Sequence, residues 1–315
     1  MLAYIIKRVL AFIPTMFIVV TIIFILTRVV PGDPAWVLVG HQGVTIEKVE
    51  QVRKELGLDK PIVVQYVSWL SRAIKGDLGN SIFYKRPVIE IISEKFFVTL
   101  SLAVGALLLT IIIALPLGIL SATKHNTIVD NISMVFAVLG VSLPVFWIGF
   151  LFIILFAVSL KWFPSSGYEP LTSGFIPWIK HLFLPVVSLS LTQIALLTRI
   201  TRSSMLEILG QDYITTARAK GLSERTVIYK HALKNALVTI VTIVGLVFAL
   251  SLGGSVLVEN VFAIPGLGRL IVTAAVRRDY PMVQGGMLYL TGIALVINLV
   301  VDISYTLINP RVTYK

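Results

Sequence analysis

Long apolar runs with almost no charge most constrain what this chain can fold into. A run that crosses the hydrocarbon core of a bilayer as a helix needs about 20 residues. Six segments of the 315-residue chain meet this requirement, at about 9–30, 97–122, 133–159, 182–200, 236–258 and 284–308. Since 57% of the residues are hydrophobic and 14% are charged, a soluble domain could not hide this apolar surface from water. The predicted fold class is an all-α integral membrane protein with six transmembrane helices, in one transmembrane domain over residues 1–315.

The first run follows Lys7 and Arg8, as the apolar core of a signal peptide would. It is much longer than the ~7–15 residues of such a core, and no A-x-A cleavage pattern follows it. We therefore expect an anchor that stays in the protein.

Basic residues in the short loops set the orientation of a membrane protein, with the basic loops inside. If Lys7 and Arg8 are inside, six spans return Arg311 and Lys315 to the same side, so both termini are predicted to be cytoplasmic. The segment 31–96 is then external, and the basic loop 201–235 is cytoplasmic. Long external segments translocate largely regardless of their charge, so the basic residues of 31–96 do not contradict this topology.

Two helices are predicted within the external segment. Residues 45–56 have apolar side chains at helical spacing before Gly57, which can end the helix. A second helix is predicted over 61–76, where Tyr66 and Trp69 form an aromatic stripe that suits the membrane interface. Packing against the bundle explains both helices, and docking of an external partner is the alternative.

Prolines occur inside the predicted spans at Pro14, Pro116 and Pro144. Each removes a backbone hydrogen bond, which neighbouring helices or water must replace within a membrane. We interpret them as packing kinks, with a gating role as the alternative.

The loop between the fourth and fifth spans is patterned as two short helices separated by a glycine. Asp212 is expected to cap the first helix, and Gly221 to adopt a positive φ that ends it and turns the chain. Ser223 is expected to cap the second helix, with Glu224 in the first turn where the helix dipole favours it. Such an elbow could seat in a groove of a soluble protein partner. The alternative is an amphipathic loop that rests on anionic lipid headgroups.

This loop resembles the coupling region of the membrane subunits of ABC importers, in which a Glu-Ala-Ala-x3-Gly-x9-Ile-x-Leu-Pro stretch seats in a cleft of the ATPase subunit. Anchored on Gly221, the general pattern is matched by Ala217, Gly221 and Leu233. The Glu is replaced by Thr215 and the Pro by Lys234. The resemblance implies an ATPase-coupling site made by Asp212, Tyr213, Thr215, Thr216, Ala217, Arg218, Lys220, Gly221, Ser223, Glu224, His231 and Leu233.

Further motifs resemble the dipeptide/oligopeptide/nickel branch of these importers, and the resemblance covers nearly the whole chain. They are PGDP (31–34), GLDKPIVVQYVSWL (57–70), GDLGNSI (76–82), GVSLPVFWIG (140–149), ENVFAIPGLGRL (259–270) and RRDYP (277–281). Within the branch, the chain resembles the first of two paired permeases, which has the long external segment after its first span.

The resemblance implies the partners and the division of labour. A second homologous permease would form the pathway together with this chain, two ATP-binding-cassette subunits would dock on the internal face, and an external substrate-binding protein would deliver cargo. ATP and Mg²⁺ would be bound by the ATPase subunits. Peptides are the favoured cargo, with nickel or metallophore complexes, glutathione and some sugars as alternatives.

The motifs that are missing agree with a membrane subunit that is not an enzyme. No Gly-x4-Gly-Lys-Ser/Thr phosphate loop, His-Glu-x2-His metal motif or Gly-x-Ser-x-Gly nucleophile elbow occurs, and there is no cysteine. We expect no cofactor or metal in this chain, and the placement of its basic residues argues against a nucleic-acid partner.

An ion-coupled secondary transporter is the alternative from a different class. Such proteins place ionisable groups deep in the membrane, because coupling ions need ligands there. Here Arg28, Arg199 and Glu259 lie near span ends and are expected to snorkel to the interface. Asp302 lies inside a predicted span, where capping or pairing with a neighbouring helix is the simpler explanation.

Overall fold

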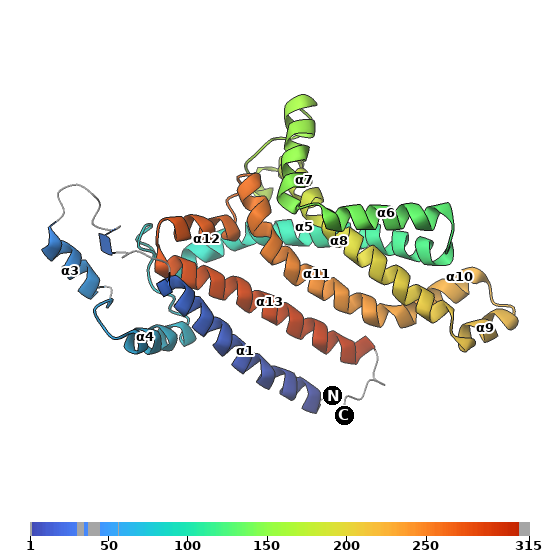
Figure 1. Ribbon diagram of the computed structural model, residues 1–315, viewed down its shortest axis with the longest axis horizontal. Coiled ribbons are helices and arrows are strands. Elements are labelled where there is room, and N and C mark those ends of the chain that lie inside the picture. The colour runs from blue at the N-terminus through green and yellow to red at the C-terminus, as the bar shows by residue number, and fades with distance from the viewer. Residues whose placement is uncertain (1, 30–34, 37–44, 56, 309–315) are drawn as a thin grey trace. The chain divides into compact units, whose positions relative to one another are not determined.

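The computed structural model is built from helices joined by loops (Figure 1). It describes residues 2–29, 35–36, 45–55 and 57–308, with the backbone alone at several helix-end positions. The long helices are α1 (Leu2–Val29), α5 (Val88–Thr123), α6 (Ile128–Ser142), α8 (Phe175–Leu209), α11 (Leu233–Val261) and α13 (Tyr280–Ile308). The shorter ones are α3 (Ile46–Glu55), α4 (Ile62–Ile74), α7 (Val145–Phe152), α9 (Asp212–Ala219), α10 (Glu224–Thr226) and α12 (Leu267–Val276). π-Helical turns cover Ile153–Ser159 (η1) and Val227–Ala232 (η3), and a 3₁₀ turn covers Leu171–Ser173 (η2).

Some predictions fall on parts of the chain that lie outside this description. The PGDP motif at 31–34 and the C-terminal Arg311 and Lys315 lie outside the described residues. The side chains of Lys7, Arg8 and Asp302 do so as well, because only the backbone is described at these positions.

Five helical stretches within the described residues are long and apolar enough to cross a membrane. They are Leu10–Val29, Val88–Thr123, Phe175–Leu209, Glu224–Val261 and Tyr280–Val301. Each coincides with one of the predicted spans, so five of the six are confirmed as long apolar helices. The helices extend beyond the apolar runs because polar turns at their ends continue the backbone hydrogen bonding.

The remaining predicted span, 133–159, is not one straight helix. α6 and α7 meet at a bend of 100°. Pro144 precedes α7 as its N-cap residue, and Leu143 before it is extended (φ −96°, ψ 130°). Proline disfavours the helical conformation in the residue before it, so the helix breaks here. Of the other two prolines, Pro14 lies inside α1 and Pro116 inside α5, and α8 contains a further one, Pro185.

The described contacts divide the chain into two units, each considered by itself. The first is built mainly from Leu100–Ile264, where α8 packs against α6, α7 and α11. Small residues allow close approach between helices in a membrane. At Gly118 of α5, for example, an added Cβ would lie 2.6 Å from the Cβ of Thr201 in α8.

Polar side chains inside the first unit are joined in a short network. The buried Gln193 of α8 accepts a hydrogen bond from Thr110 of α5 (3.2 Å) and donates one to Ser251 of α11 (2.8 Å). Glu259 is also fully buried, near the end of α11. The expectation that its carboxylate snorkels to the interface is therefore wrong.

The second unit comprises Lys7–Thr99 and Pro265–Ile293. Both helices predicted in the external segment are present, as α3 and α4, and Gly57 after α3 has φ +66° as expected for a helix end. Phe24 of α1 contacts the rings of Tyr66 and Trp69, at 5.2 and 5.7 Å between centroids. Packing of α4 against α1 is thus confirmed.

A buried carboxylate joins two distant motifs of the second unit. Asp279, in RRDYP, accepts hydrogen bonds from the hydroxyl of Ser81 and from the backbone N–H of Ile82, Phe83 (both 3.1 Å) and Met282 (3.3 Å). Ser81 and Ile82 belong to GDLGNSI, almost 200 residues earlier in the chain (separation of 198 to Ser81). The two motifs therefore form one structural junction, which we call the Asp279 junction.

Candidate functional site

Residues 212–235, here called the elbow segment, turn sharply at Gly221. Gly221 has φ +79°, as predicted. Its N–H donates to Arg218 O (2.9 Å), and the N–H of Leu222 donates to Ala217 O (3.4 Å), which is the Schellman pattern that ends a helix. A Cβ added at Gly221 would meet nothing within 4 Å. Backbone conformation, and not lack of space, therefore makes this position favour glycine.

The predicted caps of the two helices are half correct. Ser223 caps α10 as expected, because its hydroxyl accepts a hydrogen bond from the Thr226 N–H at 3.4 Å. The Asp212 cap is wrong: Gln211 is the N-cap residue of α9, without a side-chain cap, and Asp212 is the first helical residue. In that first turn the Asp212 carboxylate is still favoured by the helix dipole.

The second helix of the elbow segment is not a separate short helix. α10 continues through η3 into α11, so that one helical stretch runs over Glu224–Val261. Likewise, α8 continues to Leu209, which places the first part of the predicted loop 201–235 within a long helix. Figure 1 shows α9 and α10 at the same end of α8 and α11. The second half of the elbow segment is thus a direct extension of α11, whereas α9 is a separate helix that begins after the break at Gly210 and Gln211.

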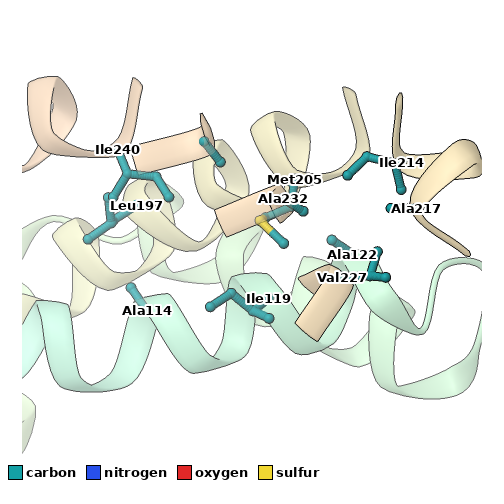
Figure 2. Close-up of a cluster of buried hydrophobic side chains, with 11 residues drawn as sticks. Ala114, Ile119, Ala122, Leu197, Met205, Ile214, Ala217, Val227, Ala232 and Ile240 are labelled. Atoms are coloured by element: carbon teal, nitrogen blue, oxygen red, sulfur yellow. The ribbon is translucent and has the colours of Figure 1, made fainter. Parts of the chain in front are cut away.

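Apolar side chains anchor the elbow segment to the first unit (Figure 2). Ile214 and Ala217 of α9 and Val227 and Ala232 of η3 are buried. They belong to one cluster with Ala114, Ile119 and Ala122 of α5, Leu197 and Met205 of α8, and Ala236 and Ile240 of α11. Burying a side chain such as Ile214 stabilises the fold by roughly 1.5–3 kcal/mol. The position of the elbow segment is therefore set by hydrophobic packing.

Polar contacts on the surface of the elbow segment connect its helices. Arg218 Nε donates to Glu224 Oε1 at 2.8 Å, which bridges the glycine turn. Asn235 Nδ2 donates to the hydroxyl of Tyr213 at 3.0 Å and so connects α11 with α9. These contacts lie in solvent and leave the outward face polar.

The predicted coupling residues separate into surface and packing positions. Ala217 is buried, and Leu233 is partly buried against the hydrophobic cluster. These two positions, which match the family pattern, therefore help to anchor the elbow segment. His231 is also partly buried. The exposed positions are Asp212, Tyr213, Thr215, Thr216, Arg218, Lys220, Gly221, Ser223 and Glu224. The face available to another protein is therefore the α9 helix and the turn that follows it.

A cleft lies beside the elbow segment. It has a volume of about 540 Å³ and is lined by the ends of α5 and α8 together with Arg218, Glu224 and Ile228. Its walls include Leu206 and Leu209 as well as the Arg218–Glu224 pair, so apolar and charged surface meet there. Such a surface fits a protein side chain better than a metal ion, and the described residues contain no group of three or more His, Asp or Glu that could hold one.

Sequence reasoning missed a buried ion pair at this end of the first unit. Asp130, at the start of α6, is 1% exposed and accepts bidentate hydrogen bonds from Arg202 of α8, from Nε at 2.6 Å and Nη2 at 2.7 Å. It also accepts from the Ser121 hydroxyl of α5 and the Asn126 N–H (3.0 Å). This network joins three helices near the elbow segment. The separation of 72 residues between the partners explains why no local pattern revealed it.

Comparisons with known proteins agree with this architecture. Residues 114–314 match the family model "Binding-protein-dependent transport system inner membrane component", and residues 1–103 match the model of its N-terminal part. The chain is 48% identical over 314 residues to a protein of Brucella abortus (strain 2308) named for a peptide transport system permease, with 100% of both chains covered. It is 42% identical over 315 residues to the glutathione transport system permease protein GsiC of Escherichia coli (strain K12), again with 100% of both covered.

A solved structure shares the fold. The inward-facing MetNI methionine ABC transporter matches with a TM-score of 0.55 and 19% identity, covering 70% of this chain and 96% of that chain. With this identity the likeness concerns the fold alone. The matched models and the full-length relatives together show that the chain belongs to the family of binding-protein-dependent transport system inner membrane components.

Proposed function

We propose that this permease forms, with a second homologous permease, the membrane pathway for short peptides in an ATP-driven importer. An external substrate-binding protein would deliver the peptide, and two ATP-binding-cassette subunits would bind and hydrolyse ATP with Mg²⁺. The names of the relatives support the choice of cargo, because one names peptides and the other glutathione, which is itself a tripeptide. Glutathione is accordingly the alternative cargo within the same class.

The structure of the elbow segment is the observation that carries this proposal. Its apolar side is buried in the first unit, whereas α9 and the Gly221 turn expose polar side chains. We propose that this exposed face docks on an ATPase subunit. The Gly221 turn leads into α10, and α10 is continuous with α11. A displacement of the docked turn would therefore be transmitted along a helix that reaches Val261. Closure of the ATPases would in this way change access to the pathway.

The proposed topology places the elbow segment and both termini in the cytoplasm. The surroundings of the elbow segment support this, since basic residues dominate there, among them Arg218, Lys220, Arg225 and Lys230. The segment 31–96 would then be external. No phosphate loop occurs in the sequence, so the ATP sites are assigned to the partner subunits.

A pull-down of the tagged chain from native membranes in mild detergent, followed by mass spectrometry, tests the proposal. We expect recovery of a second permease, of subunits that carry a phosphate-binding loop, and of an external binding protein when peptide is added. If the chain is recovered alone and still supports uptake without ATP, the proposal is refuted in favour of an ion-coupled transporter.

A further inference from the structure

A cleft in the second unit combines positive charge with unsatisfied polar atoms. It has a volume of about 520 Å³ and lies among the C-terminal end of α1, the helix α4, residues 77–82 and the start of α13. Its lining includes the polar or amphipathic side chains of Arg28, Gln65, Trp69 and Arg72.

The charge of the cleft favours an anion. Arg28, Lys54, Lys60 and Arg72 line it, against the single carboxylate of Asp77. That carboxylate already accepts a hydrogen bond from the Gly79 N–H at 2.8 Å. None of the four cations forms an ion pair with a carboxylate in the part of the chain that the structure describes. Within the described residues, four positive charges therefore line this cavity without a carboxylate partner.

Three buried polar atoms of this cleft have no hydrogen-bond partner among the residues that the structure describes: Arg28 Nε, Trp69 Nε1 and Gln65 Oε1. Burying such an atom without a partner destabilises the protein, so each of them favours a ligand. Trp69 is 7% exposed and is held against Phe24. The Arg28 guanidinium carbon lies 5.3 Å from the centroid of the Phe24 ring and 5.5 Å from that of Tyr280. Both donors are thus fixed in place before any ligand binds.

The third atom, Gln65 Oε1, is an acceptor, so it needs a hydrogen-bond donor on the ligand. Gln65 Nε2 donates to the Lys60 and Leu58 carbonyl oxygens, at 2.8 and 3.3 Å, and these bonds fix the amide with its Oε1 as the remaining acceptor. A matching ligand therefore carries anionic oxygens for Arg28 and Trp69 and a hydroxyl or ammonium group for Gln65.

The cleft lies beside the end of a helix that is long and apolar enough to span a membrane. Arg28 is in the last turn of α1, and a span over Leu10–Val29 would place it where the hydrocarbon core ends. α4 packs one side on α1 and exposes apolar side chains on another, including Val63, Val67 and Ile74. An amphipathic helix with a tryptophan beside the end of a span is typical of the membrane interface.

We propose that this cleft binds the phosphate group of a phospholipid headgroup. Arg28 and Trp69 donate hydrogen bonds to the phosphate oxygens, and Gln65 accepts one from the hydroxyl or ammonium group of the headgroup, as in phosphatidylglycerol or phosphatidylethanolamine. The acyl chains lie against the apolar surfaces of α1 and α4. The bound lipid fastens α4 to the bilayer at the end of α1.

Native mass spectrometry of the full-length, delipidated chain tests this proposal, with dioctanoyl phosphatidylglycerol and inorganic phosphate as separate probes. We expect Arg28→Gln and Trp69→Phe each to weaken binding of the lipid by about tenfold, because each removes a hydrogen bond to an anionic group. Trp69→Phe keeps an aromatic ring packed against Phe24, so it tests the site even if Arg28→Gln disturbs folding. Lys75→Gln, just after α4 and outside the cleft lining, and Trp162→Phe are the matched controls.

The two probes separate the possible sources of the phosphate group. Tighter binding of the lipid than of inorganic phosphate, sensitive to both cleft variants and insensitive to both controls, supports the headgroup assignment. Equal binding of the two probes refutes the lipid as the source and leaves a site for a free phosphate anion. Lipid binding that is the same in wild type and both cleft variants overturns the site itself.

Discussion

The Asp279 junction and the elbow segment each contain a turn of the chain, but different kinds of contact stabilise the two turns. At the junction a carboxylate that is 1% exposed accepts four hydrogen bonds and joins segments almost 200 residues apart. Across the elbow, the side chains of the ion pair Arg218–Glu224 are 43% and 61% exposed and only six residues apart. Buried polar contacts therefore stabilise one region, whereas the other is anchored by apolar packing and keeps its charges in solvent. Stability and partner binding are expected to depend on different residues.

The largest effect is expected for Asp279→Ala. The substitution leaves the Ser81 hydroxyl and three backbone N–H groups without their acceptor in a buried site. We expect a loss of about 3–5 kcal/mol in the free energy of unfolding. Thermal unfolding of the detergent-solubilised protein measures this loss, with the exposed Asp59→Ala as control. Equal stability of the two variants would show that the junction is not a structural lock.

Arg202→Ala is expected to have the next largest effect, because Asp130 would remain buried without its cation. Since Ser121 and Asn126 still donate to that carboxylate, we expect a smaller loss of about 2–3 kcal/mol. Arg202→Lys keeps the charge but loses the bidentate geometry, so its stability should be intermediate. Unfolding measured as above tests the order; a Lys variant as unstable as the Ala variant would contradict a role for the charge.

Gly221→Val tests the function of the elbow more than its stability. Valine at φ +79° costs about 1–3 kcal/mol locally, and we expect the subunit to insert while ATP hydrolysis no longer drives uptake. Gly221→Ala should show the same defect more weakly. Uptake per ATP hydrolysed in proteoliposomes is the measurement, and Gly210→Ala, at φ −82°, is the control. Wild-type coupling in the valine variant would refute the role of the turn.

The smallest effect is expected for Arg218→Ala. An exposed ion pair contributes about 0.2–1 kcal/mol, and salt screens it. We therefore expect a stability change below 1 kcal/mol that vanishes at high salt. A larger loss, or one that is independent of salt, would mean that the pair and not the apolar anchor holds the elbow.

The local features of the elbow segment were predictable from the sequence, but its continuity with the long helix α11 was not. Gly221 and Ser223 act through their own backbone and side chain, so residue type was sufficient to predict the turn and the cap. The charged side chains of Arg225 and Lys230 favoured a separate surface helix, yet the backbone hydrogen bonds of α10 continue through η3 into α11. Charge on one face does not interrupt a helix whose other face is buried.

Features that depend on residues far apart in the chain could not be predicted from the sequence. The Asp130–Arg202 and Asp279–Ser81 pairs are separated by 72 and 198 residues, so no local sequence pattern indicates them. Glu259 lies near a span end, which predicted an exposed carboxylate, but tertiary packing buries it. The helix α12 was missed because its ten residues are too short for a span. Fold class and family were nevertheless predictable, since the six apolar runs and the motifs extend along the whole chain.

Docking of an ATPase subunit on the elbow segment is the central claim, and site-specific crosslinking tests it most directly. The chain has no cysteine, so Lys220→Cys on the exposed turn provides an attachment point for a photo-crosslinker that is unique within this chain, and crosslinked products in native membranes are recovered through a tag on it. Lys161→Cys, an exposed lysine in the loop after η1, is the matched control. We predict a crosslinked product that contains a phosphate-loop ATPase subunit from position 220 and none from position 161. A product at position 220 that contains only lipid, or equal ATPase products from both positions, would contradict the claim.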